Sequence, residues 1–235
     1  MSEVKYVHTE RMHNTIAATE ILPYIFKFKN VESTLDVGCG NGSRLKAAKN
    51  LGVQEVMGLD GIQIAESEMN IESSEFCKKN LTSIFDLGKK YDLLISLEVA
   101  EHLPESAANT FIKSLTNHSD CILFSAAIPG QGGQYHVNEQ WPNYWNKKFI
   151  ENGYEAYDVL RNHFWNNKKV FWWYKQNMIL YVKKNSGLMN NFLPDVDVSA
   201  IVHPDLYNKK TTKPKYLSNK ERFKDIKNIL KSFIR

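Results

Sequence analysis

The hydrophobic positions along the chain fall into short apolar runs that alternate with amphipathic stretches. Gly, Asn and Asp bound the runs, and the stretches between them place apolar residues at helical spacing. Strands and helices in alternation are typical of a parallel sheet, so the pattern predicts an α/β fold. The predicted strands cover residues 33–37, 53–59, 74–77, 91–97, 121–127, 155–160 and 176–182.

The predicted helices begin and end at recognisable signals. Gly52 follows one helix and is its expected C-cap, because glycine readily adopts the left-handed conformation that ends many helices. Pro104 begins another helix. Pro23 lies inside the first helix and is expected to kink or divide it. The predicted helices cover residues 16–28, 43–51, 62–69, the segment from Pro104 through Leu115, and 144–152.

The chain divides into one main domain and a C-terminal appendage. Residues 1–184 form the predicted domain, and residues 185–235 form an arm and a basic amphipathic helix. The arm, over 185–216, contains three prolines and little periodicity. The closing helix has apolar residues at helical spacing, which suits packing on its own domain or on a partner subunit, so a homodimer is one alternative. These apolar residues are Phe223, Ile226, Leu230 and Phe233.

Composition narrows the class of protein. Of the 235 residues, 43% are hydrophobic, which excludes disorder throughout. The net charge of +4 is mild and much of the excess lies between Lys209 and Arg235, so a nucleic-acid groove within the domain is not favoured. Three separated cysteines without a CxxC pair indicate a reducing compartment. With no leader-like start and no apolar run of membrane length, we expect a cytoplasmic enzyme.

The strongest motif is LDVGCGNG over residues 35–42, where a strand runs into three glycines at alternate positions. Glycine lets a ligand approach the backbone closely. A dinucleotide site looks similar, because Asp60 at the end of the second strand would also suit the ribose of NAD. Asp36 separates the two interpretations, since a carboxylate repels a pyrophosphate but suits the sulfonium and ammonium groups of S-adenosylmethionine. Gly42 also follows Gly40 by two residues and not by three.

Three motifs together resemble the class I methyltransferases: LDVGCGNG, GLDG at residues 58–61, and ISLEVAEHLP at residues 95–104. The resemblance runs from about residue 13 to residue 182. It implies a Rossmann-like, doubly wound sheet of seven strands with helices on both faces and the last strand antiparallel. It also implies S-adenosylmethionine as cofactor and S-adenosylhomocysteine as product.

By that resemblance, the glycine loop lines the methionine end of the cofactor, Asp60 accepts both ribose hydroxyls, and Ile62 packs on the adenine. The family often has an Asp-Leu pair after the third strand, where this chain has Asn80 and Leu81. The expected cofactor-binding residues are Asp36, Gly38, Cys39, Gly40, Gly42, Asp60, Gly61, Ile62, Asn80, Leu81 and Glu98.

A second group of residues contains the candidates for catalysis and metal binding. Glu98, Glu101 and His102 follow the fourth strand at spacings that share one side of a helical turn, and His136 lies beyond the fifth strand. These four residues resemble the pattern in terminal-ribose RNA methyltransferases and ubiquinone-pathway O-methyltransferases, so they are candidate ligands for a divalent metal. In a second interpretation no metal is present. The catalytic candidates are then His136, as a general base, and His102.

The loop over residues 131–141 is rich in amides and ends in a tryptophan, as a polyhydroxylated substrate would need. The stretch from residue 124 to residue 182 also resembles a bacterial methyltransferase subgroup associated with surface polysaccharides and nucleotide sugars. The sequence therefore predicts O-methylation of a sugar or glycan-precursor hydroxyl in polysaccharide biosynthesis. The alternatives are ribose 2′-O-methylation of RNA and a binding module for S-adenosylmethionine without turnover.

Overall fold

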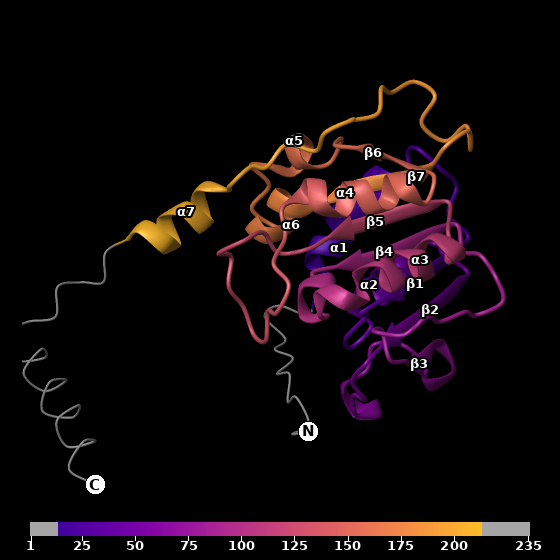
Figure 1. Ribbon diagram of the computed structural model, residues 1–235. Coiled ribbons are helices and arrows are strands. Elements are labelled where there is room, and N and C mark those ends of the chain that lie inside the picture. Colours follow the sequence, from indigo (N-terminus) through magenta and orange to yellow (C-terminus); the bar gives the residue numbers. More distant parts are fainter. Residues whose placement is uncertain (1–13, 213–235) are drawn as a thin grey trace, which may run out of the picture. The chain divides into compact units, whose positions relative to one another are not determined.

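The computed structural model describes residues 14–212, which belong to two compact units, Met1–Ile201 and Val202–Arg235. The first unit is built on a seven-stranded sheet of order β3-β2-β1-β4-β5-β7-β6 (Figure 1). Helices cover both faces, so the predicted fold class is confirmed. The strands are β1 (Ser33–Val37), β2 (Glu55–Asp60), β3 (Phe76–Lys78), β4 (Leu93–Leu97), β5 (Cys121–Ser125), β6 (Tyr154–Tyr157) and β7 (Ile179–Lys183).

The strand directions bring the loops that follow β1 to β5 to one edge. These five strands are parallel, whereas β7 runs antiparallel to both β5 and β6. The strand order reverses between β1 and β4, which are neighbours in the sheet. In open α/β sheets a ligand crevice lies outside the carboxyl ends of the strands at such a reversal. The fold therefore places the candidate motifs around one crevice.

Two hydrophobic clusters hold the helices to the sheet. Side chains of β4 alternate between them, with Ile95 and Leu97 in one cluster and Leu94 in the other. The first cluster joins the sheet to α1 (Ile16–Ile25), α2 (Ser43–Asn50), α5 (Arg161–Phe164) and α6 (Trp172–Asn177). The second joins it to α3 (Ala108–His118) and α4 (Pro142–Glu151).

Several predicted elements differ from the structure in extent. The lead-in helix ends at Ile25, three residues before the predicted end. The helix expected over 62–69 is only a 3₁₀ turn at Glu66–Glu68, because Ile64 alone is buried there and no apolar face forms. The last strand begins at Ile179 and not at 176, since the preceding residues form the helix α6.

The first unit extends beyond the predicted boundary after residue 184, because the arm adds to the edge of the sheet. The backbone of Asp195 bridges to Ala156 of the edge strand β6, with its N–H donating to the Ala156 carbonyl at 2.8 Å. The Asp195 carboxylate accepts from the N–H of Asp158 at 2.7 Å. Asn146 of α4 donates to the Val196 carbonyl at 3.0 Å. Residues 195–199 thus belong structurally to the first unit and not to a free arm.

The second unit is described as far as residue 212 and contains one helix, α7 (Pro204–Thr211), within the arm that was predicted to be extended. Pro204 occupies the first helical turn, and the His203 side chain accepts from the N–H of Asp205. The amphipathic helix predicted around residues 223–233 lies outside the described residues. Among residues 14–212, no helix combines the length and the apolar character that crossing a membrane would require.

A buried arginine ties several of these segments together. Arg161 is 1% exposed, and its guanidinium donates two hydrogen bonds to Asp158, at 2.8 and 2.5 Å. It also donates to the carbonyl of Ser199 in the arm at 2.8 Å. A buried charge requires such partners because it has lost its hydration. Arg161 therefore fastens residues 195–199 to the end of β6.

We predict that Arg161→Met lowers the free energy of unfolding by roughly 3 to 5 kcal/mol, because it leaves the Asp158 carboxylate without its partner. Urea unfolding followed by circular dichroism measures the change. Lys90→Met is a matched control, since it also removes one cation of a close ion pair, with Asp120 at 2.5 Å, but both side chains are well exposed. Equal stability losses in the two variants would contradict this account of Arg161.

Candidate active site

The glycine loop after β1 has a shape that side chains would prevent. Gly38 has φ +79°, and a Cβ built on it would lie 2.2 Å from a methyl carbon of Val99. At Gly42, with φ +75°, a Cβ would lie 2.7 Å from Ile71. The N–H of Gly38 donates to the carbonyl of Leu59 at the end of β2 at 2.7 Å, which fixes the loop to the sheet. The loop is thus a rigid cradle that only glycine can form.

The Cys39 side chain faces away from this cradle. Its thiol is buried against the sheet, where a Cβ at Gly58 would come within 2.7 Å of the sulfur. Burial raises the pKa of the thiol, so it stays protonated. The predicted role of Cys39 in binding the cofactor can therefore involve its backbone only.

Asp60 is held in place at the end of β2. One carboxylate oxygen accepts the N–H of Gly40 at 2.9 Å, and the other accepts the N–H of Ile62 at 2.9 Å. Each oxygen of a carboxylate can accept a further hydrogen bond, so Asp60 can still take two donors from a ligand. Gly61 beside it is exposed and Ile62 is partly buried. The geometry is consistent with the predicted contact to a ribose, which remains a prediction.

Asn80 and Leu81 follow β3 at the same edge. The Asn80 side-chain oxygen accepts the N–H and the hydroxyl of Thr82, at 3.0 and 2.7 Å, and so shapes a turn. Leu81 is buried in the second hydrophobic cluster. The amide oxygen of Asn80 is therefore already engaged within the chain, and its predicted contact with adenine remains a prediction.

Asp36 has a partner that the sequence interpretation did not consider. Its side chain is fully buried and accepts two hydrogen bonds from Arg44 of α2, both at 2.9 Å. Burial raises the pKa of the Asp36 carboxyl, and the Arg44 charge acts in the opposite direction. Arg44 therefore already forms an ion pair with the carboxylate that was predicted to receive a positively charged head group. A contact between the cofactor and the backbone around Asp36 remains a prediction.

Glu98 directly follows β4 in a left-handed conformation, with φ +55°. Its carboxylate accepts the side-chain amide of Gln131 at 2.7 Å and that of Asn177 at 3.1 Å. Gln176 in turn donates to both of these amides, at 3.2 and 2.9 Å. Burial raises the pKa of Glu98, while these amide hydrogen bonds oppose the rise. An amide network from the β5–α4 loop and α6 therefore fixes the carboxylate at the crevice.

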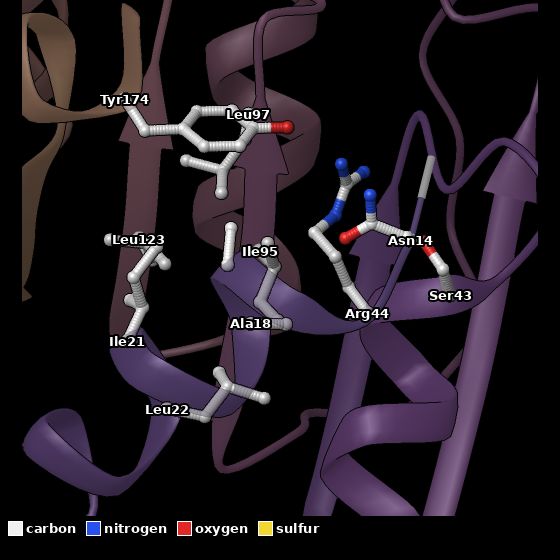
Figure 2. A pocket seen from close by; sticks show the side chains of 11 residues that line it. Asn14, Ala18, Ile21, Leu22, Ser43, Arg44, Ile95, Leu97, Leu123 and Tyr174 are labelled. Atoms are coloured by element: carbon white, nitrogen blue, oxygen red, sulfur yellow. The ribbon is translucent and has the colours of Figure 1, made fainter. Parts of the chain in front are cut away.

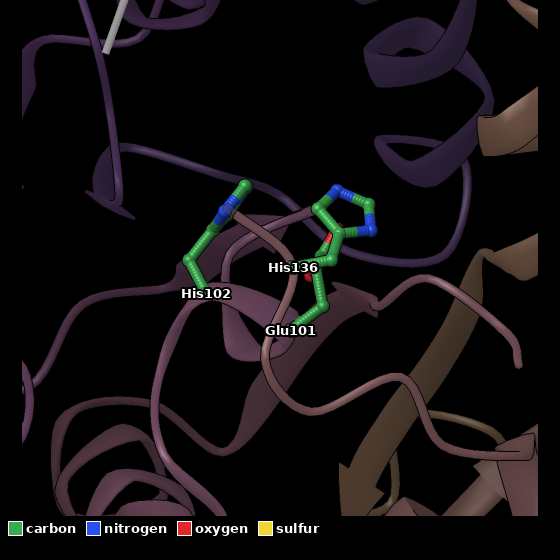
Figure 3. A group of neighbouring side chains, drawn as sticks. All are labelled: Glu101, His102 and His136. Atoms are coloured by element: carbon green, nitrogen blue, oxygen red, sulfur yellow. The ribbon is translucent and has the colours of Figure 1, made fainter. Parts of the chain in front are cut away.

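Three of the four predicted metal candidates come together. One oxygen of Glu101 and one ring nitrogen each of His102 and His136 lie within 4.8 Å of one another (Figure 3). Glu98 is not part of this group. Neither carboxylate oxygen of the fully buried Glu101 has a side-chain hydrogen-bond partner, and burial raises the pKa of this carboxyl well above its usual value. Burial also lowers the pKa of His102 to about 4, so this imidazole is neutral at physiological pH.

His136 is oriented by a second carboxylate. Its Nδ1 lies 2.8 Å from Glu139, which also accepts the N–H groups of Gly130 and Gly132 at 2.7 and 2.6 Å. Donation from Nδ1 to Glu139 leaves the lone pair on Nε2 available. Gly133 makes room for this ring, because a Cβ there would lie 2.1 Å from Nε2. The loop therefore presents His136 in one orientation.

A pocket opens between α1, α2, β4, β5 and α6 on one face of the sheet (Figure 2). Most of its lining residues are apolar, Asn14 and Ser43 are polar, and Arg44 and Tyr174 stand on opposite sides of the pocket (Figure 2). Among the aromatic residues at 165 and 171–174, Tyr174 lines this pocket. The apolar lining residues are Ala17, Ala18, Ile21, Leu22, Ile95, Leu97 and Leu123.

Four residues that shape the site were not among the predicted site residues: Arg44, Glu139, Gln176 and Asn177. A signal existed for two of them, because Gln176 and Asn177 form a polar pair that interrupts the apolar stretch before the last strand. Glu139 lies three residues after His136, but loop residues follow no periodic rule. The spacing of apolar residues in α2 does not distinguish Arg44 from the other polar residues of that helix.

The comparisons with known proteins agree with this geometry. Residues 8–174 match the sequence profile of a methyltransferase domain family, so the chain belongs to that family. The prediction of a class I, S-adenosylmethionine-dependent methyltransferase is confirmed. A comparison with curated protein sequences gave no match.

Solved structures share the fold at low sequence identity. CalS10, an amino pentose methyltransferase from Micromonospora echinaspora, has a TM-score of 0.55 at 13% identity, covering 78% of this chain and all of that one. DesVI from Streptomyces venezuelae has a TM-score of 0.54 at 12% identity, covering 72% and 91% of the two chains. Magnesium protoporphyrin IX methyltransferase from Synechocystis PCC 6803 has a TM-score of 0.51 at 17% identity, covering 76% and 89%.

We predict that Asp60→Ala weakens binding of S-adenosylmethionine by about tenfold to a hundredfold, because hydrogen bonds to a charged group are lost. Isothermal titration calorimetry measures the affinity. Asp60→Asn should have a smaller effect, since the amide keeps one acceptor oxygen. Glu68→Ala, which removes an exposed carboxylate in the loop after β2, serves as the control. Unchanged affinity in Asp60→Ala would remove Asp60 from the cofactor site.

Proposed function

We propose that this methyltransferase transfers the methyl group of S-adenosylmethionine to a hydroxyl of a sugar or glycan precursor in surface-polysaccharide biosynthesis. The observation that carries the proposal is the group formed by Glu101, His102 and His136 at the carboxyl edge of the sheet. A hydroxyl acceptor must lose a proton as the new bond forms, and this group can assist that loss.

The cofactor placement follows the strand order. The adenine lies beside Asn80 and Leu81 after β3, and the ribose hydroxyls face Asp60 after β2. The amino-acid group then lies at the glycine loop after β1, on the side of β4. The positive φ angles and tight packing of the loop support this placement, because a Cβ on Gly38 would close the cradle. Glu98, fixed by its amide network, offers a carboxylate to the positively charged end.

The bound cofactor supplies a methyl group activated by a sulfonium, so the chain has mainly to position the acceptor and accept its proton. His136 is suited to the second task. Its Nδ1 is paired with Glu139, and one of its ring nitrogens lies within 4.8 Å of ligand atoms of Glu101 and His102. Glu139 stabilises the positive charge that His136 acquires on taking up the proton. His102, whose pKa is lowered to about 4, stays neutral beside it.

The same three residues fit a divalent metal. Two imidazoles and one carboxylate form a usual donor set, and the carboxylate oxygens of Glu101 have no side-chain hydrogen-bond partner. Glu139 would support His136 as the carboxylate that orients a ligating histidine. Such a metal, when bound, lowers the pKa of a coordinated hydroxyl. Metal ligation and metal-free general-base catalysis are therefore the two roles that this group can serve.

The surface beside this group supports a polar, ring-containing acceptor. Within the β5–α4 loop, Tyr135 is 54% exposed and Trp141 is 44% exposed, although large aromatic side chains usually bury. The partly buried amides of Gln134 and Gln140 lie in the same loop. Aromatic faces beside hydrogen-bonding groups suit a sugar ring. CalS10, which shares the fold, is described as an amino pentose methyltransferase, and this is consistent with a sugar acceptor.

The proposal predicts incorporation of labelled methyl groups into a nucleotide sugar or a polysaccharide precursor. A panel of these compounds is incubated with the enzyme and labelled S-adenosylmethionine, and the products are analysed by mass spectrometry. His136→Ala should reduce turnover by about a hundredfold or more, as expected for loss of a general base or ligand. His163→Ala, at a histidine that stacks on Tyr24 away from the group, is the control. Labelling of amine acceptors alone would contradict the proposal of O-methylation.

Removal of metal distinguishes the two roles of the histidine–carboxylate group. If a divalent metal is held there, prior treatment with a chelator should abolish turnover, and added Mg²⁺, Mn²⁺ or Zn²⁺ should restore it. Glu101→Gln should reproduce the loss while cofactor affinity is retained. Full activity in the chelator, together with loss of activity in His136→Ala, would reject the metal and support the general base.

A further inference from the structure

Gln176 lies one step behind the two amides that hold the Glu98 carboxylate. Its side-chain nitrogen donates to Oε1 of Gln131 at 3.2 Å and to Oδ1 of Asn177 at 2.9 Å. An amide nitrogen carries two hydrogens, so these bonds use both of them. All three amide residues are buried, and Gln176 has no exposed surface at all. Water therefore does not compete for these hydrogen bonds.

The hydrogen bonds of this network run toward the carboxylate. The amide oxygens of Gln131 and Asn177 accept from Gln176, and their nitrogens donate to Glu98 at 2.7 and 3.1 Å. If either amide were turned over, its oxygen would face a carboxylate oxygen and its nitrogen would face the donor nitrogen of Gln176. Both contacts would join like groups. The direction of each amide is therefore set from both of its ends.

Asn177 depends on Gln176 more than Gln131 does. Oε1 of Gln131 also accepts from Asn177 at 2.9 Å and from the N–H of Ile128 at 3.3 Å. Oδ1 of Asn177 takes its hydrogen bond from Gln176. Loss of that donor would leave a buried oxygen unsatisfied, which costs free energy unless the amide turns. A turn would withdraw the N–H that Glu98 accepts, so a change at Gln176 reaches Glu98 through Asn177.

Glu98 depends on these donors because its surroundings oppose a negative charge. Burial raises the pKa of its carboxyl and the charge of Glu139 raises it further, whereas its side-chain hydrogen bonds lower it. Glu101 is a second carboxyl close enough to interact with the charge of Glu98. Donors that point at a carboxylate stabilise its ionised form, and a chain of hydrogen bonds strengthens each member.

We propose that Gln176 is a positioning residue for cofactor binding. It holds the amides of Gln131 and Asn177 with their N–H groups toward Glu98, so that Glu98 meets the positively charged end of S-adenosylmethionine as a carboxylate. The inference rests on the cofactor placement proposed above. It adds a buried residue of α6 that acts on the ligand through hydrogen bonds in series.

The test compares two ligands by isothermal titration calorimetry: S-adenosylmethionine and 5′-methylthioadenosine, which has neither the sulfonium charge nor the amino-acid group. Gln176→Met keeps the length of the side chain and removes both donors. It should weaken binding of S-adenosylmethionine by about tenfold and leave the affinity for 5′-methylthioadenosine unchanged. Gln54→Met is the matched control, because it removes an exposed glutamine amide that donates to the Gly52 carbonyl at 2.8 Å. It should change neither affinity.

A double-mutant cycle shows whether Gln176 acts through Glu98. Glu98→Gln should weaken binding of S-adenosylmethionine by about tenfold to a hundredfold. Adding Gln176→Met to it should weaken binding no further, because no charge then remains at position 98 for the donors to hold. Additive losses would make the role of Gln176 merely structural and overturn the proposal. Equal losses for the two ligands in Gln176→Met would have the same meaning.

Nuclear magnetic resonance of the side-chain amides tests the orientation apart from the cofactor. The Asn177 amide protons are bonded to Glu98 and Gln131, so they should exchange slowly with deuterated solvent in the wild type. Gln176→Met should accelerate this exchange by about tenfold or more. Unchanged exchange would overturn the role of Gln176. Accelerated exchange with unchanged affinity for S-adenosylmethionine in Glu98→Gln would instead show that the cofactor placement at Glu98 is wrong, and would remove Gln176 from cofactor binding with it.

Discussion

The cost of withdrawing a carboxylate from water governs the organisation of this active site. Three such groups lie wholly or partly buried near the carboxyl ends of β1 and β4, and each is compensated differently. Asp36 is paired with Arg44, and Glu98 is surrounded by side-chain amides. Glu101 has neither kind of partner. Because an uncompensated buried charge is strongly unfavourable, an acid in that position takes up a proton or a cation. The way each carboxylate is held therefore indicates what it can do.

This arrangement separates two tasks along one edge of the sheet. The ion pair of Asp36 with Arg44 and the hydrogen bonds of Asp60 to backbone N–H groups are internal to the chain, and they hold both carboxylates in place. Glu101 has no such ion pair, and together with His102 and His136 it lies in the loops after β4 and β5. A methyl donor that spans β3 to β4 would end beside that group. In the proposed placement, strand order thus brings the methyl donor to the edge of the sheet that carries this group.

Much of the fold followed from the sequence because continuous apolar runs and glycine turns are local signals. The strands up to β5 and the glycine cradle were predicted at nearly their observed positions. Predictions failed where tertiary contacts decide the structure, as at residues 62–69, which have no apolar face, and at residues 176 and 177, which were predicted to begin the last strand but end the helix α6. The pairing of Arg44 with Asp36 could not be predicted, since it depends on how α2 crosses β1. The meeting of His102 with His136 was expected from strand ends, but the support from Glu139 depends on loop conformation.

The segment that pairs with β6 has a further consequence for the behaviour of the whole molecule. An edge strand presents unsatisfied backbone groups to which strands of other chains can add, and this is a common route to aggregation. Here the Asp195 backbone occupies part of that edge, and the contacts of Arg161 and Asn146 keep it there. The contacts of residues 195–199 therefore cover part of the β6 edge, and we expect them to limit intermolecular β-sheet growth.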